Sequence, residues 1–237
     1  MAANARNSHN LILSRSHPAF GASAETVTFR AGETILAANR TTTHVFFPES
    51  LVATFVRHLL DGSTIGAGIV GFEGVIGIEA MFGATAQPSD VIVQVGGTAV
   101  RVPAMIAGSV FESDREFRGL VLRFANAFAL QIGQAAVCNW FHPLERRLSY
   151  WLLNVADRIA STNGQKGIEI SLTQEFLANM LGTRIASINE AISTLTTSGL
   201  IRHRRHLIEI VDRPGLEEGA CECYATVSSL YARDRVL

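Results

Sequence analysis

The spacing of hydrophobic and polar positions changes twice along this chain of 237 residues. From residue 25 to about 104, short runs rich in β-branched and aromatic residues are separated by Gly, Asn, Pro, Ser or Asp, which is typical of strands joined by turns. From 113 to 139 the apolar residues recur at helical spacing without a proline. A new helical pattern follows His142-Pro143, because proline is tolerated at the start of a helix but not inside it.

This pattern predicts an α+β protein with a small antiparallel β-roll at its N-terminal end. We divide the chain into a leader (1–24), a β-roll (25–112), a long helix (113–140) and a C-terminal domain (141–237). The leader is expected to be poorly ordered or loosely docked. Within the roll, residues 91–104 predict a pair of strands around Gly96-Gly97, and residues 77–83 one helical turn.

The most informative stretch is 171–211, which predicts two short helices around a glycine turn, followed by a basic hairpin. Thr173 is a good N-cap for the first helix, and Gly182 supplies the backbone freedom that a tight turn needs. The second helix is expected over 184–197, and Gly199 ends it. A hairpin with the run Arg-His-Arg-Arg-His at its tip completes the plan of a winged helix-turn-helix.

In such a domain the second helix enters the major groove of double-stranded DNA, and the wing contacts phosphates. Serine, asparagine and glutamate side chains on that helix can hydrogen-bond to base edges or to the backbone, and the wing arginines suit phosphate. The alternative is that these polar residues only form a solvated surface. The expected DNA-contacting residues are Thr173, Arg184, Ile185, Ser187, Asn189, Glu190, Arg202, Arg204 and Arg205.

From about residue 26 to 211 the sequence resembles the Crp/Fnr family of bacterial transcription regulators. The resemblance rests on GFEGVIGIEAMFG (71–83), HPLERRLSYWLLNVADRI (142–159), LTQEFLANMLGTRIASINEAISTL (172–195) and GLIRHRRHLIEIVDRPGLEEGACECY (199–224). It is specific at the C-terminal end and looser in the roll. Two departures stand out: Ile185 replaces the second of two paired arginines, and Arg205-His206 replaces an arginine-glycine at the wing tip.

The resemblance implies a cyclic-nucleotide-binding-like jelly roll, a long helix that forms the seam of a homodimer, and RNA polymerase as a further partner. A long helix with a wide apolar face can pack on the roll with one side and on a second copy with the other. The alternative is a helix buried wholly within one subunit. The predicted seam residues are Phe117, Leu120, Val121, Phe124, Phe128 and Ile132.

The residues that would hold cyclic AMP are missing. The resemblance places a ribose-binding glutamate directly after Gly77, where the chain has Ile78, with Glu79 one position late. It places a phosphate-binding arginine-serine pair on Pro88-Ser89, and the neighbouring Asp90 would repel a phosphate. We therefore expect no cyclic-nucleotide site. The weak candidates for an effector site are Gly77, Ile78, Glu79, Ser89, Phe124 and Phe128.

Other sensing chemistries have little support in the sequence. An iron–sulfur cluster needs about four cysteines, and none precedes Cys138. Haem would need an axial ligand, and His44 and His58 are each isolated in the predicted roll. The remaining alternatives are an unknown effector lodged beside Phe124 and Phe128, or none at all.

Composition narrows the class of protein. The formal net charge is −1, so affinity for DNA must come from a local patch. No run of 18 apolar residues and no signal pattern occurs, which predicts a cytoplasmic protein without a membrane partner. The pair Cys221 and Cys223, with one residue between the thiols, has poor zinc spacing, and no second ligand pair lies nearby, so we expect no metal site and no cofactor. No catalytic constellation is visible, which disfavours the rival class, a β-roll enzyme or ligand-binding protein with a helical appendage.

Overall fold

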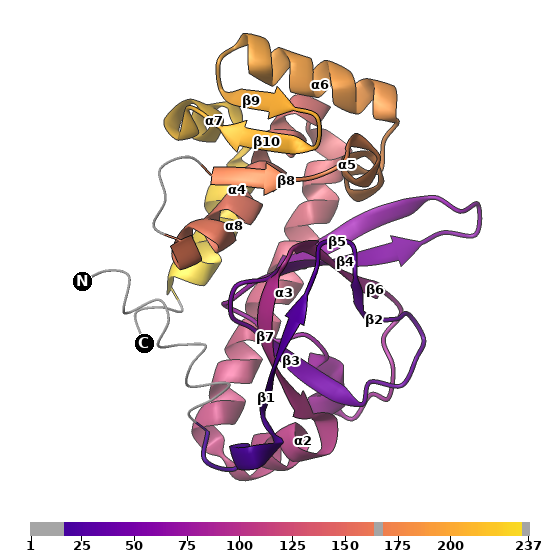
Figure 1. The fold of residues 1–237 in the computed structure, drawn as a ribbon, viewed down its shortest axis with the longest axis vertical. Helices are drawn as coiled ribbons and strands as arrows, with labels where there is room; N and C mark the ends of the chain where they lie inside the picture. Colours follow the sequence, from indigo (N-terminus) through magenta and orange to yellow (C-terminus); the bar gives the residue numbers. More distant parts are fainter. Residues whose placement is uncertain (1–16, 164–167, 234–237) are drawn as a thin grey trace.

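The computed structural model describes residues 17–163 and 168–233 (Figure 1). The N-terminal domain contains, in chain order, η1 (Gly21–Ser23), β1 (Glu25–Phe29), β2 (Thr34–Leu36), β3 (His44–Pro48), β4 (Val52–His58), β5 (Thr64–Val70), η2 (Ile78–Phe82), β6 (Asp90–Val95), β7 (Gly97–Pro103) and α2 (Ala104–Ser113). After α3 (Arg115–Phe141) come α4 (Leu144–Asn163), β8 (Ile168–Ser171), α5 (Gln174–Leu181), α6 (Ile185–Thr197), β9 (Ile201–Arg204), β10 (Leu207–Ile210), α7 (Arg213–Gly219) and α8 (Glu222–Arg233).

The roll is built from two antiparallel sheets. One has the strand order β1-β7-β3 and the other β2-β6-β4-β5. The predicted strands β6 and β7 are present, but the prediction that they pair with each other is wrong, because each belongs to a different sheet. The chain crosses between the sheets at Gly97, where a Cβ atom would lie 2.6 Å from the backbone of Ser50 and Leu51. The turn expected over 77–83 is the short helix η2.

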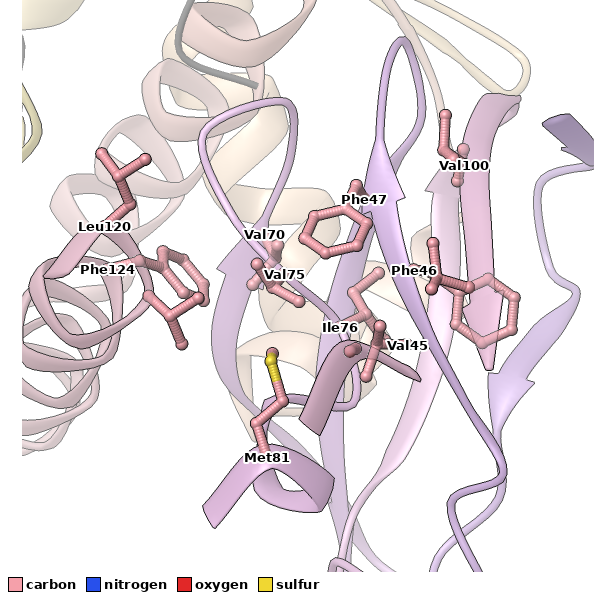
Figure 2. Close-up of a cluster of buried hydrophobic side chains, with 14 of the residues drawn as sticks. Val45, Phe46, Phe47, Val70, Val75, Ile76, Met81, Val100, Leu120 and Phe124 are labelled. Atoms are coloured by element: carbon pink, nitrogen blue, oxygen red, sulfur yellow. The ribbon is translucent and has the colours of Figure 1, made fainter. Parts of the chain in front are cut away.

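The core of the N-terminal domain lies between the two sheets and the first half of α3 (Figure 2). Leu120 and Phe124 extend from α3 toward Val70 and Val75 of the roll, and all four are buried. The leader contributes as well: Phe20 is 1% exposed, and its ring packs edge-on against Phe117. The described end of the leader is therefore part of this core, which corrects the expectation of loose docking.

The buried side chain of Gln131 fixes the position of α3 along the roll. Gln131 is 2% exposed. Its Nε2 donates to the carbonyl of Ile69 at 3.3 Å, and its Oε1 accepts from the amide of Ile69 at 3.4 Å. The side-chain amide of Gln131 thus bonds to both the backbone N–H and the backbone carbonyl of Ile69 on β5, as a neighbouring strand would.

By length and composition α3 is apolar enough to cross a membrane, with a mean hydropathy of 1.3 over its most apolar window. A third of that window is buried inside the chain. Asp114 caps the helix by accepting from the amide of Phe117 at 2.9 Å, so the helix predicted over 113–140 is divided from α2 at this residue.

The C-terminal domain has its own core around α4, α5 and α6, and two roll residues, Val52 and Ile69, join that core. Its sheet has the order β8-β10-β9. The hairpin of β9 and β10 was predicted, whereas β8 was not. Figure 1 shows the roll and the α6 end of the second domain at opposite ends of the molecule, with α3 running between them.

A buried ion pair joins the two domains. Arg158 of α4 donates from Nε to Oε1 of Glu73 at 2.7 Å, and the two side chains are only 5% and 13% exposed. Burial lowers the pKa of the Arg158 guanidinium, but Glu73, Tyr231 and Asp157 together raise it by more, so the pKa lies above its ordinary value. The guanidinium is therefore charged at every physiological pH.

Candidate nucleic-acid interface

The turn between α5 and α6 has the geometry that its residues predict. Thr173 caps α5 by accepting a hydrogen bond from the amide of Phe176 at 3.0 Å. Gly182 ends the helix with a φ of +58°, a left-handed conformation that favours glycine. Ile188, Ala191, Ile192 and Leu195 are buried as the helical pattern requires. These contacts fix α6 relative to α5 and decide which face of α6 remains open.

The open face of α6 carries most of the predicted readers of DNA. Arg184, at the N-cap position, and Ile185, in the first turn, are exposed, and so are Asn189 and Glu190 further along. Ser187 is half-buried. Figure 1 shows α6 at the end of the molecule remote from the roll. The individual base contacts stay predictions.

The wing is a hairpin with a two-residue loop. Arg204 pairs with Leu207, which leaves Arg205 and His206 as the loop. Arg205 has a φ of +46°, which residues other than glycine and asparagine seldom adopt. Arg204 and Arg205 are exposed, whereas Arg202 already forms a 2.6 Å ion pair with Glu209. Two of the three wing arginines are therefore without this internal pairing.

The positive φ leads to a stability prediction for the wing. Replacement of Arg205 by glycine should stabilise the fold by about 1 kcal/mol, since glycine adopts a left-handed conformation without steric cost. The same change should weaken DNA binding by removing a cation near phosphate. Urea unfolding and DNA titration measure the two effects. Arg204→Gly is the matched control, and equal stability changes in both variants would contradict the strain argument.

Thr173 lies beside the wing, on the side of the domain that faces the roll. It lines a cleft between the domains together with Gly32 and Gln94 of the roll and His206 of the wing. DNA backbone must reach this cleft if Thr173 is to contact a phosphate. Its role in DNA binding stays a prediction.

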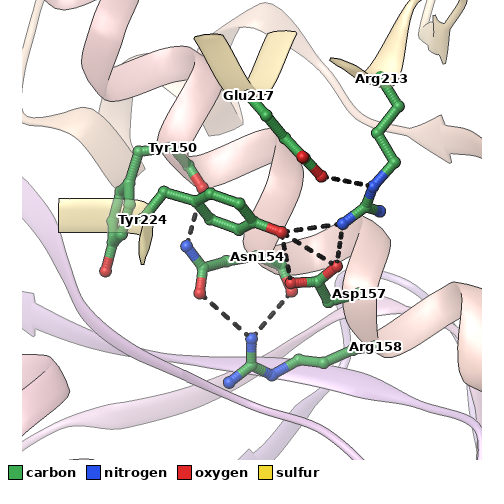
Figure 3. Close-up of polar contacts among 7 residues, drawn as sticks. All are labelled: Tyr150, Asn154, Asp157, Arg158, Arg213, Glu217 and Tyr224. Carbon is green, nitrogen blue, oxygen red and sulfur yellow. Dashed lines mark hydrogen bonds and ion pairs between the residues drawn. The ribbon is translucent and has the colours of Figure 1, made fainter. Parts of the chain in front are cut away.

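A polar network anchors the C-terminal helices α7 and α8 to α4 (Figure 3). Arg213 of α7 forms ion pairs with Asp157 at 2.5 Å and Glu217 at 2.8 Å, and it donates to the Tyr224 hydroxyl at 2.8 Å. Burial raises the pKa of Tyr224 to about 12, so the hydroxyl keeps its proton and donates to Asp157 at 3.1 Å. The network thus connects α4, α7 and α8.

The predicted dimer seam needs a correction. Phe117, Leu120, Val121 and Phe124 are at most 6% exposed because they pack in the core of the roll, so they are not available to a partner. Phe128 is half-buried, and Ile132 is 38% exposed. The exposed apolar surface of α3 is a different stripe, formed by Leu122, Ala129, Leu130, Gly133, Ala136, Val137, Trp140 and Phe141.

The candidate effector residues are mostly occupied by contacts within the chain. Glu79 accepts a hydrogen bond from Thr42 at 3.0 Å, and buried Ser89 bonds through its backbone to the side chain of Gln87. The rings of Phe124 and Phe128 stack with centroids 5.7 Å apart. A Cβ atom at Gly68 would lie 2.7 Å from the Phe128 ring. An effector beside these rings therefore requires them to move.

The three cysteines lie close together in the fold, although Cys138 and Cys221 are 83 residues apart in the sequence. Cys138 and His142, one helical turn apart, face Cys221 and Cys223. The expectation that no second ligand pair lies near Cys221 and Cys223 is therefore wrong. The signal that was missed is the local spacing Cys-x3-His at the end of a helix, which gains meaning only when the fold brings it to the distant Cys221 and Cys223.

Comparison with known proteins supports the helix-turn-helix geometry of the C-terminal domain. Residues 146–218 match the family described as the Crp-like helix-turn-helix domain. No curated protein has a significantly similar sequence.

Solved structures match over most of the chain. A CRP-family transcriptional regulator from Thermus thermophilus is 20% identical with a TM-score of 0.68, over 82% of this chain and 96% of its own. FixK2 from Bradyrhizobium japonicum is 15% identical with a TM-score of 0.69, over 84% and 98%. The c-di-GMP responsive regulator CLP from Xanthomonas campestris is 11% identical with a TM-score of 0.65, over 81% and 96%.

These matches define the class of fold: residues 146–218 form a Crp-like helix-turn-helix domain. The chain as a whole shares the fold of solved CRP/FNR-family regulators.

Proposed function

We propose that the protein is a homodimeric, cytoplasmic regulator that recognises a two-fold site in double-stranded DNA. The observation that carries the proposal is the open face of α6, with Arg184, Asn189 and Glu190 exposed beside a wing that bears Arg204 and Arg205. Arginine and asparagine can bind guanine and adenine edges, glutamate can accept from cytosine, and the wing cations suit phosphate. RNA polymerase is the partner through which such a protein would act.

The second subunit is proposed to dock on the exposed stripe of α3. The stripe positions 122, 129, 133, 136 and 140, together with the exposed Asn126, alternate by three and four residues, which is the spacing of a coiled-coil seam. Trp140 is 83% and Phe141 71% exposed, an unusual degree for large apolar side chains. Ala129, Gly133 and Ala136 allow two helices to approach closely. A parallel pair would present two α6 helices to one operator.

The roll is proposed to act as a scaffold or as a sensor of an effector other than cyclic AMP. The backbone amide of Ala38 donates to Asp90 at 2.7 Å, and His58 lies 2.7 Å from the same carboxylate. This carboxylate is therefore firmly held where the resemblance requires phosphate, and it would repel that group. An effector would act by favouring one arrangement of the two DNA-binding domains.

The test is DNA binding by the purified chain and by Arg184→Ala. With DNA from upstream of its own gene, anisotropy titrations should show specific binding that weakens steeply with salt. The variant should bind about 10- to 100-fold less tightly, since one base or phosphate contact is worth about 1–3 kcal/mol. Arg40→Ala, an exposed arginine of the roll, is the matched control.

An unchanged affinity in Arg184→Ala would show that α6 does not read DNA. Equal affinity for operator and random DNA, with and without candidate effectors, would instead favour the rival class, a roll that binds or converts a small ligand.

A further inference from the structure

Four potential metal ligands converge where the two domains and the last helix meet. Cys138 lies in the last turn of α3, and His142 caps that helix at the junction with α4. Cys221 precedes α8, and Cys223 lies in its first turn. One ligand atom from each of the four residues lies within 4.8 Å of every other.

The distances within the cluster fit a single tetrahedral ion. The Sγ atoms of Cys138 and Cys221 are 3.5 Å apart, and Cys223 Sγ is 3.5 Å from Nδ1 of His142. Ligands about 2.3 Å from a tetrahedral zinc ion are separated from each other by about 3.8 Å. A disulfide would need about 2.05 Å between the sulfurs, and all three cysteines are free. The thiols therefore have the separation of co-ligands.

The surroundings orient the ligands. His142 Nε2 lies 3.3 Å from Oε1 of Glu222, which leaves Nδ1 facing the thiols. A carboxylate on the far nitrogen of a histidine is the usual outer partner of a zinc ligand. Gln134 donates from Nε2 to Cys223 Sγ at 3.1 Å, a hydrogen bond that suits a thiolate. The three cysteines are at most 3% exposed, so the cluster is largely shielded from water.

We propose that Cys138, His142, Cys221 and Cys223 bind one zinc ion. Three thiolates and an imidazole in tetrahedral array suit zinc, whereas calcium and magnesium require oxygen ligands. An iron–sulfur cluster would hold its ligands further apart, because several iron and sulfide atoms lie between them. On binding, the thiols release their protons and the ion takes their place.

The bound ion would connect three parts of the molecule. It would tie the start of α8 to the junction of α3 and α4, from which the DNA-binding domain continues. Further along α8, the Tyr231 ring lies over the guanidinium of Arg158, 5.3 Å from ring centroid to carbon. The zinc site therefore lies at the junction between α3 and the DNA-binding domain, and a bound ion would hold that junction more firmly.

The test is cobalt and zinc binding by the full-length protein after chelation under reducing conditions. We expect one cobalt ion per chain, with the intense visible bands of a tetrahedral site and thiolate charge-transfer absorption, both abolished by one equivalent of zinc. Circular dichroism confirms that each variant is folded. Because metal binding is measured without DNA, a negative result would contradict the zinc site without contradicting the proposed function.

Three variants sharpen the result. Cys223→Ser and His142→Gln should lose the cobalt spectrum. Glu222→Gln keeps all four ligands and should weaken metal binding about 10- to 100-fold while preserving the stoichiometry. His58→Gln, in the roll, is the control and should bind like the parent. Absence of the spectrum in the reduced parent chain, its persistence in Cys223→Ser, or formation of a Cys138–Cys221 disulfide in place of metal binding would overturn the proposal.

Discussion

Replacement of Gly133 by arginine is expected to convert the protein from a dimer to a monomer and to abolish specific DNA binding. Gly133 lies in the middle of the exposed stripe of α3, and a Cβ atom there meets nothing within its own chain. The folded subunit should therefore tolerate the change. A charged, long side chain would instead prevent close approach of a second α3 and would leave a cation in an apolar seam.

The loss of one of two half-sites should reduce affinity for the operator by about 10³-fold or more, toward the level of nonspecific binding. Sedimentation or light scattering gives the mass, and anisotropy the affinity. Gly108→Arg is the matched control, because Gly108 is also a helical glycine with nothing within 4 Å, but it lies on α2. A dimeric Gly133→Arg protein would show that the seam lies elsewhere.

Replacement of Glu73 by alanine should be the most destabilising of the single changes considered. It would leave the Arg158 guanidinium buried beneath the roll without its carboxylate partner. Removal of one member of a buried ion pair typically costs about 3–5 kcal/mol. Urea denaturation of the full chain measures this loss of stability, and the midpoint temperature of thermal unfolding should also fall.

Two further variants separate charge from packing. Glu25→Ala breaks the exposed pair of Glu25 with Arg101, whose side chains are 62% and 38% exposed, and should cost at most about 1 kcal/mol. Combining Glu73→Ala with Arg158→Met removes the unpaired charge and should recover part of the lost stability. A double variant less stable than Glu73→Ala alone would contradict the argument.

Local patterns in the sequence predicted the helix-turn-helix closely. The cap at Thr173, the left-handed turn at Gly182 and the buried positions of α6 depend on neighbours within a few residues. Such interactions are encoded by helical spacing and by residue chemistry. The wing was also predicted from neighbouring residues, because its hairpin is closed by a loop of only two residues.

Features that depend on distant parts of the chain were harder to predict. The residues 91–103 gave two strands, but nothing local indicates that the chain passes from one sheet to the other at Gly97. The amphipathic pattern of α3 marked two apolar faces without indicating which one the roll covers. Phe117 and Phe124 were consequently assigned to the partner, although they pack inside the subunit.

The cysteine cluster shows the same limit. Cys138 and Cys221 are separated by 83 residues. Their proximity results from α8 folding back along α3. The spacing from Cys138 to His142 and that from Cys221 to Cys223 do not indicate it. Composition led us to look for a local basic patch, because the net charge of the chain is −1 and residues 202–206 are a dense basic run; the role of this patch stays a prediction.

The paired hydrogen bonds between Gln131 and Ile69 restrict the motions that a regulated dimer has available. A shift of α3 along its axis by one turn, about 5.4 Å, would separate the Gln131 amide from both backbone groups, and the carbonyl of Ile69 would keep its 3.4 Å contact with Arg158. A tilt of the helix about Gln131 displaces the bonded atoms less than such a shift does. We therefore expect a change in the roll to reach the DNA-binding domain as a tilt of α3 about Gln131.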